Sequence, residues 1–466
     1  MHVRKQFSIR HSKSFYFVAA IAACCLVVFA GAGVQYVDNI SALARWIFLG
    51  LLLVTLAVKM KLGTALKGAC GAAVAAFLLW CVLSVLWSSY PTLTLPKAFS
   101  YAAVALSMSA VGHLWAFHGK KEDIFALLLP LATLVVVSAL ASAAAGTDAL
   151  RTNETTFLYR GLANNPNFLG ILVICVLPAA LWEVYRQDTS KLRKLLSYTL
   201  LVSLTVMLIS SYSRASILAA LIIVFSFMFG AGLRRYSAAI AIAVAALVMV
   251  IVAFPSGLAE FESRYIYKSA GEDASLFDSR ETVWRASYIA ALDGGPFGFG
   301  FGVAAEDAER RLEQSEIETS SSHYGREKGN STLAIVEELG WVGLMTFALV
   351  LWTFCQRALG AVRLSQNREY KLISALILGT ALALLTNAQF EAWFLAPGSA
   401  AAPVFWLFLG LGLGFRERID RTRRRSRSDG DDAGAGTIGI DQYGRVVGAV
   451  RSTPHPFAGS FPSPWR

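Results

Sequence analysis

Long apolar runs separated by short polar connections make up most of the chain. A helix needs about 20 apolar residues to cross a bilayer, and the charged flanks of these runs show where each one ends. The predicted spans lie near 15–34, 43–60, 67–87, 98–117, 123–145, 166–184, 196–212, 215–232, 237–256, 330–354, 372–390 and 398–415. This pattern predicts an all-α, polytopic integral membrane protein with about 12 transmembrane helices, divided between residues 15–256 and 330–415.

One connection is much longer than the others. Residues 257–329 are polar and separate the ninth predicted span from the tenth. Within them, Asp278 and Glu281 form a D-x-x-E capping box, and Gly294-Gly295-Pro296 ends the helix that the box begins. Trp284 lies one turn after Arg280 on this helix. The sequence therefore predicts a large loop with an amphipathic helix suited to the membrane interface.

Lys and Arg residues are concentrated in every second connection. They cluster near Lys59–Lys67, Lys120–Lys121, Arg186–Lys194, Arg234–Arg235, Arg357–Lys371 and Arg416–Arg427. The positive-inside rule then places residues 1–14 and the basic tail 416–466 in the cytoplasm and the loop 257–329 outside. The tail is rich in Gly, Ser, Asp and Pro after Arg427 and is predicted to be disordered.

Composition supports a membrane protein. Hydrophobic residues make up 56% of the chain and charged residues 16%, against about 45–50% and about 25% in soluble proteins. Nucleic-acid binding, cytosolic catalysis and secretion are therefore poor starting hypotheses. The net charge of +11 is explained mainly by the basic connections, and the six cysteines show no metal-ligand spacing.

Single cations on the predicted outer side are candidates for ligand binding, because orientation does not require them. Arg160 precedes Asn165-Pro166-Asn167 at the start of the sixth span, where a helix N-terminus and a guanidinium attract phosphate. Arg214 lies in a tight outer turn. The alternatives stay open: Asn-Pro-Asn could simply cap the span, and Arg214 could contact lipid headgroups.

Two further features lie near the tenth span. Glu338 falls about two turns inside an apolar helix, where an ionisable group is costly and is a functional candidate by default. Residues 296–302, Pro-Phe-Gly-Phe-Gly-Phe-Gly, lack the context of a nucleotide-binding loop. We interpret them as a flexible, aromatic-lined turn.

Four motifs occur in order on the predicted outer side. They are R-G-x-x-x-N-P-N at 160–167, S-R-A at 213–215, R-x-x-x-W at 280–284 followed by P-x-G-x-G at 296–300, and N-x-x-L-x-x-x-x-E-x-G-x-x-G at 330–343. Together they resemble the O-antigen ligase and O-antigen polymerase superfamily of bacterial glycan assembly, over about residues 40–415.

The resemblance implies a GT-C-like membrane fold in the bacterial inner membrane, with the large loop in the periplasm. It implies a metal-independent glycosyltransferase without a cofactor. The donor would be a glycan linked to undecaprenyl pyrophosphate, and the acceptor a growing polysaccharide or a lipid. Membrane lipids and other polysaccharide assembly proteins are further expected partners, and nucleic acid is not. Arg160, Arg214 and Arg280 match the positions that hold pyrophosphate, and Asn167, Trp284, Asn330 and Trp393 are expected to contact glycan.

The catalytic base is where the chain departs from the family pattern. Many ligases carry a histidine at the position of Gly329. Three candidates remain for the base: His323 in the loop, Glu338, and Glu391 in the outer turn before the last span. The missing histidine favours a polymerase of polysaccharide repeat units over a ligase that transfers glycan to lipid A core. A flippase or transporter of lipid-linked sugars, and an inactive scaffolding relative, are the alternatives.

Overall fold

The computed structural model describes most of the predicted membrane region. The described residues are 18, 21–28, 38–58, 61–144, 150–153, 156–161, 163, 165–187, 190–233, 278–304 and 328–434. The predicted ninth span at 237–256 and the candidate base His323 lie outside them.

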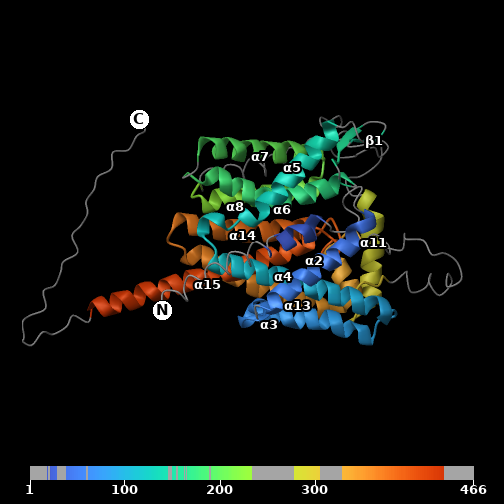
Figure 1. Ribbon diagram of the computed structural model, residues 1–466. Coiled ribbons are helices and arrows are strands. Elements are labelled where there is room, and N and C mark those ends of the chain that lie inside the picture. The colour runs from blue at the N-terminus through green and yellow to red at the C-terminus, as the bar shows by residue number, and fades with distance from the viewer. Residues whose placement is uncertain are drawn as a thin grey trace, which may run out of the picture. The chain divides into compact units, whose positions relative to one another are not determined.

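The described chain is almost entirely helical (Figure 1). The α-helices are α2 Asp38–Val58, α3 Gly68–Leu83, α4 Pro91–His118, α5 Leu129–Ala144, α6 Pro166–Tyr185, α7 Lys191–Ser210, α8 Arg214–Gly230, α11 Asp278–Asp293, α13 Ser331–Leu364, α14 Arg368–Asn387 and α15 Ala401–Gly434. Short 3-10 helices occur at Leu62–Leu66, Ser84–Leu86, Lys121–Asp123 and Ala126–Leu128.

Six helical segments of the described residues are long and apolar enough to cross a membrane. They are Gly68–Leu86, Lys121–Ala144, Pro166–Tyr185, Lys191–Ser210, Ser331–Leu364 and Arg368–Asn387. Two shorter apolar helices, Leu43–Val58 and Arg214–Gly230, also coincide with predicted spans. The described residues confirm an all-α architecture, and the six longer segments have the length and hydropathy of membrane spans. The total of about 12 spans stays a prediction.

Two details differ from the sequence-based expectation. Leu150–Asn153 and Thr156–Tyr159 form an antiparallel hairpin, β1 and β2, because Thr, Phe and Tyr favour strands over helix. In addition, α15 continues to Gly434, through the start of the tail that was expected to be disordered. Residues 416–429 contain no Gly or Pro to stop the helix. The bundle comprises the described residues up to Arg418, and those from Ile419 belong to a second unit.

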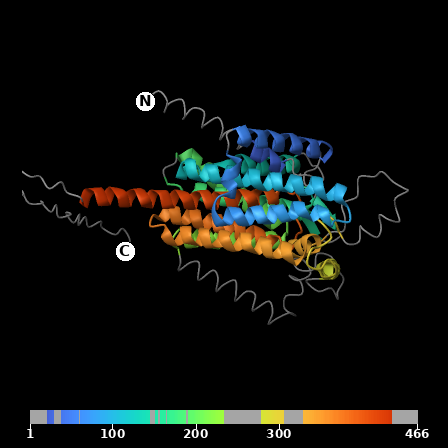
Figure 2. The same cartoon turned by 90° about the horizontal axis from the view of Figure 1, so that it is seen from below.

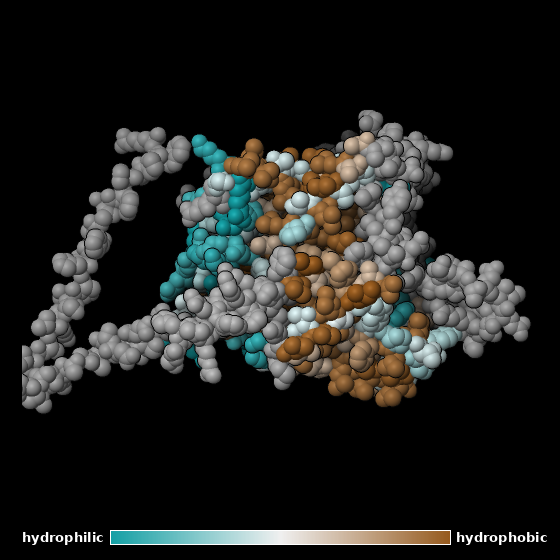
Figure 3. All heavy atoms as spheres, viewed as in Figure 1, coloured by the Kyte–Doolittle hydropathy of each residue, from teal (hydrophilic) through white to brown (hydrophobic). Residues whose placement is uncertain are grey.

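The basic connections of the bundle meet at one end. Lys121, after α4, pairs with Glu369 at the start of α14, and Arg418 donates to the carbonyl of Gly119 at 2.7 Å. A hydrophilic surface marks this end, and a hydrophobic belt crosses the bundle (Figure 3). The end of the bundle that carries α11 lies opposite (Figures 1 and 2). The structure therefore groups the connections as the alternating charge pattern predicts.

An aromatic core lies between the helices and anchors the outer segments. The ring of Phe77 on α3 lies 6.5 Å from that of Trp406 on α15. Tyr101 on α4 lies 5.3 Å from Phe301, which belongs to the segment after α11 and is fully buried. Buried aromatic contacts of this kind contribute beyond their area. The end of segment 296–302 at Phe301 is therefore packed into the core, whereas Phe297 is exposed. The structure forms the predicted turn, and its flexibility stays a prediction.

Helix α13 is broken where this segment crosses it. Gly340 has φ +68° and ψ −172°, so its backbone is not helical. The break frees two carbonyl groups, which accept hydrogen bonds from the segment: Phe299 N donates to Glu337 O and Gly300 N to Glu338 O, both at 2.9 Å. Irregular backbone at membrane depth is tolerated only where such partners are supplied by protein.

Two further bonds complete the break. The indole of Trp80 donates to Leu339 O at 3.0 Å, and Val342 N donates to Pro296 O at 3.2 Å. Segment 296–302 thus supplies hydrogen bonds that replace those of a continuous α13. Its Pro296 carbonyl approaches α13 at Gly340, which has no side chain to block it.

Gly340→Ala is expected to destabilise the protein by about 3 kcal/mol or more, through backbone strain and a clash. A Cβ at this position would lie 2.1 Å from Pro296 O. The measurement is thermal unfolding of the purified variant in detergent. Gly50→Ala is the matched control, since a Cβ at Gly50 meets nothing within 4 Å. Equal unfolding temperatures for the two variants would contradict the described break.

Candidate functional site

The first turns of α6 and α8 pack tightly at the end of the bundle that carries α11. Gly170 on α6 allows this approach, because a Cβ there would lie 2.7 Å from Ser216 Oγ and 2.8 Å from Ser213 Cβ. Pro166 occupies the first turn of α6, and the side chain of Asn165 accepts a hydrogen bond from Phe168 N at 2.7 Å. Asn165 is therefore a helix cap, as one of the two sequence interpretations proposed.

Asn167 is free of that capping role and turns toward another candidate residue. Its amide Nδ2 donates to Oε1 of Glu391 at 3.0 Å. Glu391 lies in the turn between α14 and α15, and both residues are partly exposed. The structure thus joins an expected glycan contact to a candidate base, from positions 224 residues apart. The amide of Asn167 thus fixes the orientation of the Glu391 carboxylate.

A buried polar chain holds the turn that carries Glu391. Ser213 Oγ donates to Ser216 Oγ at 2.9 Å, Asn387 Nδ2 donates to Ser216 Oγ at 3.2 Å, and the indole N–H of Trp393 donates to Asn387 Oδ1 at 3.0 Å. The sequence of bonds runs from the first turn of α8 to the turn after α14. It fixes Glu391 relative to the helix that Arg214 begins.

Trp393 itself is packed inside the protein. Only 6% of its surface is exposed, its indole N–H is occupied by Asn387, and its ring lies 6.0 Å from that of Phe394. In the described structure Trp393 therefore positions the turn, and its role as a glycan contact stays a prediction.

Asn330 is also engaged within the protein. It caps α13 by accepting from the backbone N–H groups of Thr332 and Leu333 at 2.8 and 3.0 Å. Its amide nitrogen donates to Gln389 O at 2.9 Å. All three contacts are internal, so the structure assigns Asn330 to joining α13 with the turn that carries Glu391.

The structure describes the side chains of two of the three arginines that were predicted to bind pyrophosphate. Arg160 lies partly exposed ahead of α6, and Arg214 is exposed as the first residue of α8. The backbone of Arg280 is part of α11, but its side chain lies outside the described residues. Arg214 therefore lies at a helix N-terminus, where backbone N–H groups add to its attraction for anions, whereas Arg160 lies six residues before α6 begins.

Helix α11 completes the same end of the bundle. Trp284 is partly exposed, its ring lies 6.0 Å from that of Phe390, and its indole donates to Gly329 O at 3.1 Å. Phe390 directly precedes Glu391. An aromatic pair beside a carboxylate and an amide is the combination that protein sites use to bind sugar rings.

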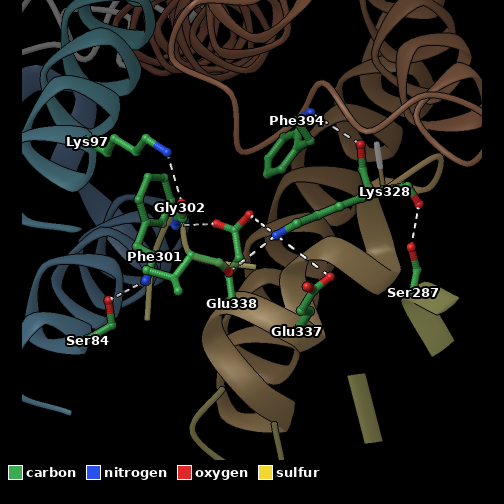
Figure 4. Close-up of polar contacts among 11 residues, drawn as sticks. Ser84, Lys97, Ser287, Phe301, Gly302, Lys328, Glu337, Glu338 and Phe394 are labelled. Carbon is green, nitrogen blue, oxygen red and sulfur yellow. Dashed lines mark hydrogen bonds and ion pairs between the residues drawn. The ribbon is translucent and has the colours of Figure 1, made fainter. Parts of the chain in front are cut away.

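Glu338 is separated from this group and already has partners. Its Oε1 accepts from Lys328 Nζ at 2.6 Å and its Oε2 from Gly302 N at 2.6 Å. With both oxygens bound inside the protein, Glu338 is poorly placed to remove a proton from an acceptor hydroxyl. Figure 4 shows this cluster, which lies where segment 296–302 crosses α13.

Sequence reasoning did not identify Lys328 or the break at Gly340. Lys97, whose Nζ donates to Gly302 O at 2.9 Å, is a further single cation on the predicted outer side. Lys328 is likewise a cation next to the predicted outer start of a span. It could not be singled out from sequence, because it lies in a polar loop where cations are common. In the part of the chain that the structure describes, no group of three or more His, Cys, Asp or Glu side chains could hold a metal ion.

Comparison with known proteins locates the family relationship more narrowly than the motifs do. No curated protein matches the chain. Residues 199–348 match the family model described as O-antigen ligase. The matched region contains Arg214, α11 and the broken part of α13, whereas Arg160, Asn167 and Glu391 lie outside it. The members of this family are ligases and polymerases that transfer glycans in membranes. The chain therefore carries an O-antigen ligase domain over residues 199–348.

Proposed function

We propose that the protein polymerises oligosaccharide repeat units carried on undecaprenyl pyrophosphate, at the periplasmic face of the bacterial inner membrane. The observation that carries the proposal is the convergence of Asn167, Glu391 and Trp284 at the bundle end where α6 and α8 begin. Arg214 at the start of α8 and Arg160 ahead of α6 supply the positive charge that a pyrophosphate leaving group requires. The carboxylate beside them suits proton removal from an acceptor hydroxyl.

In this mechanism Arg160, Arg214 and Arg280 hold the pyrophosphate of the donor and stabilise the negative charge that develops as the glycosidic bond to phosphate breaks. Glu391, oriented by Asn167, accepts the proton of the attacking hydroxyl. Trp284 and Phe390 contact a sugar ring. The residues named supply charge stabilisation, proton transfer and sugar binding.

A ligase that transfers finished glycan to lipid A core is the second candidate, because the matched family is named for that reaction. The glycine at position 329, where many ligases carry histidine, favours polymerisation. The two reactions leave different intermediates in a strain lacking this protein. A polymerase defect accumulates a single lipid-linked repeat unit, whereas a ligase defect leaves polymerised lipid-linked chains. Long lipid-linked chains in the deletion strain would therefore overturn the polymerase proposal.

The proposal requires the α11 end of the bundle to face the periplasm. A reporter that works only in the periplasm, fused near Ser321, is expected to be active, and the same reporter fused after Arg427 is expected to be silent. The reason is the Lys and Arg bias of the opposite end. Enzyme activity of the two fusions in intact cells is the measurement. The reverse pattern would place every proposed site residue in the cytoplasm and refute the proposal.

A further inference from the structure

Lys328 makes a buried ion pair just before α13 begins. Its Nζ lies 2.6 Å from Oε1 of Glu338 and 3.7 Å from Oε2 of Glu337, and 3.5 Å from Val303 O. The side chain of Lys328 is 12% exposed, and those of Glu337 and Glu338 are 0% and 8% exposed. The ammonium group donates to Glu338 and Val303 O, and Glu337 adds electrostatic attraction. Lys328 is therefore committed to contacts inside the protein.

The ion pair is connected to the segment that crosses α13. The second carboxylate oxygen of Glu338 accepts from Gly302 N at 2.6 Å, and Gly302 O accepts from Lys97 Nζ on α4 at 2.9 Å. One line of contacts thus joins Lys328, α13, segment 296–302 and α4 (Figure 4). Because α4 and α13 are packed in the bundle core, this line attaches Lys328 to the rigid part of the molecule.

The backbone around Lys328 in turn holds α11. Ser287 Oγ donates to Lys328 O at 2.7 Å, and the indole of Trp284 donates to Gly329 O at 3.1 Å. Ser287 is fully buried. Both bonds come from α11, and both acceptors lie within one residue of the Lys328 side chain that is anchored by Glu338.

We propose that Lys328 is a positioning residue for glycosyl transfer. Anchored by Glu338, it holds the carbonyl groups that accept hydrogen bonds from α11, and so places Trp284 against Phe390, beside Glu391. The proposal rests on the proposed function, since α11 matters here for the substrate-binding residues it carries. Lys328 itself does not touch the donor, because its ammonium is enclosed by protein acceptors.

Stability alone is a weak explanation for this ion pair. The cost of removing two charges from water offsets much of their attraction, and buried ion pairs often contribute little net stability compared with apolar replacements. A defined arrangement of the attached elements is the better-supported use of such a pair. In this protein the attached element is α11, and its placement can be measured separately from activity.

The test compares amide hydrogen exchange of α11 and transfer kinetics in purified full-length variants. In Lys328→Met, amides of residues 278–293 are expected to exchange about tenfold faster, because the anchor of the supporting carbonyls is lost. The ratio kcat/KM for a lipid-linked repeat unit, per folded protein, should fall about tenfold. Lys328→Arg keeps the charge and should restore most of both properties.

Lys121→Met is the matched control, since it removes a Lys–Glu pair between two connections at the opposite end; its α11 exchange and kcat/KM should stay at wild-type values. If Lys328→Met does not fold, Ser287→Ala replaces it in the test. This variant removes the hydroxyl that donates to Lys328 O, so the amides of α11 should exchange faster. Wild-type exchange of α11 in the variants, or faster exchange with unchanged kcat/KM, would overturn the positioning role. Absence of transfer by the wild-type protein would instead refute the proposed function, so the two failures are distinguishable.

Discussion

Replacing Glu391 with glutamine is expected to abolish polymer formation, with kcat lowered by about 10²–10⁴-fold, the range typical of losing a general base. Glutamine keeps the side-chain oxygen that accepts from Asn167 and removes the charge and the capacity to take a proton. The backbone of Glu391, whose carbonyl accepts from Ser331 Oγ at 2.9 Å, is unchanged. The fold should therefore survive while the chemistry is lost. Turnover of a lipid-linked repeat unit by the purified variant is the measurement.

Glu369→Gln is the control for this experiment. Glu369 is a partly exposed carboxylate that pairs with Lys121 at the opposite end of the bundle, so its loss should leave turnover nearly unchanged. Glu338→Gln should chiefly lower stability, since both oxygens of Glu338 are bound within the protein. Loss of turnover in His323→Ala, with Glu391→Gln active, would assign the base to the loop histidine.

Alanine at Arg160, Arg214 or Arg280 is expected to lower polymer yield by about 10- to 200-fold each. A hydrogen bond to a charged group is worth about 1.5–3 kcal/mol, and every 1.4 kcal/mol corresponds to a factor of about ten. Lysine at these positions should rescue only partly, because it keeps the charge and loses the bidentate geometry. Polymer from cells that carry each variant is measured at equal amounts of membrane protein.

Arg363→Ala provides the matched control for the arginines. Arg363 is exposed in the last turn of α13, at the opposite end of that helix from the proposed site, and its loss should leave the yield unchanged. Near-normal yield from all three site variants would mean that these arginines only anchor the helices to lipid headgroups.

The helices could be predicted from sequence because their signals are local. The sixth span was expected at 166–184, and α6 covers Pro166–Tyr185, since Pro at the first turn and an apolar run define it without tertiary information. The capping box at Asp278 likewise gives the start of α11. The break in α13 could not be predicted in this way. Glycine at 340 is tolerated in membrane helices, and its positive φ is imposed by segment 296–302, which lies about 40 residues earlier in the chain.

The site was predicted in part. Residue types on the outer side pointed to Asn167 and Glu391, but only tertiary structure could show that their side chains form a hydrogen bond. The internal contacts of Trp393 and Asn330 could not be predicted, because an aromatic ring or an amide near a predicted site has the same sequence signal whether it binds a ligand or packs internally. Lys328 was missed for the complementary reason: its ion pair with Glu338 depends on how the chain folds back before α13.

The most direct test of the account is glycan transfer by the purified wild-type protein in detergent or lipid nanodiscs. The protein is given a repeat unit on undecaprenyl pyrophosphate as both donor and acceptor, and products are separated by length. The account predicts a ladder of longer lipid-linked chains with release of undecaprenyl pyrophosphate, which disappears in Glu391→Gln. Unchanged single repeat units after incubation with folded wild-type protein would contradict the proposed polymerase.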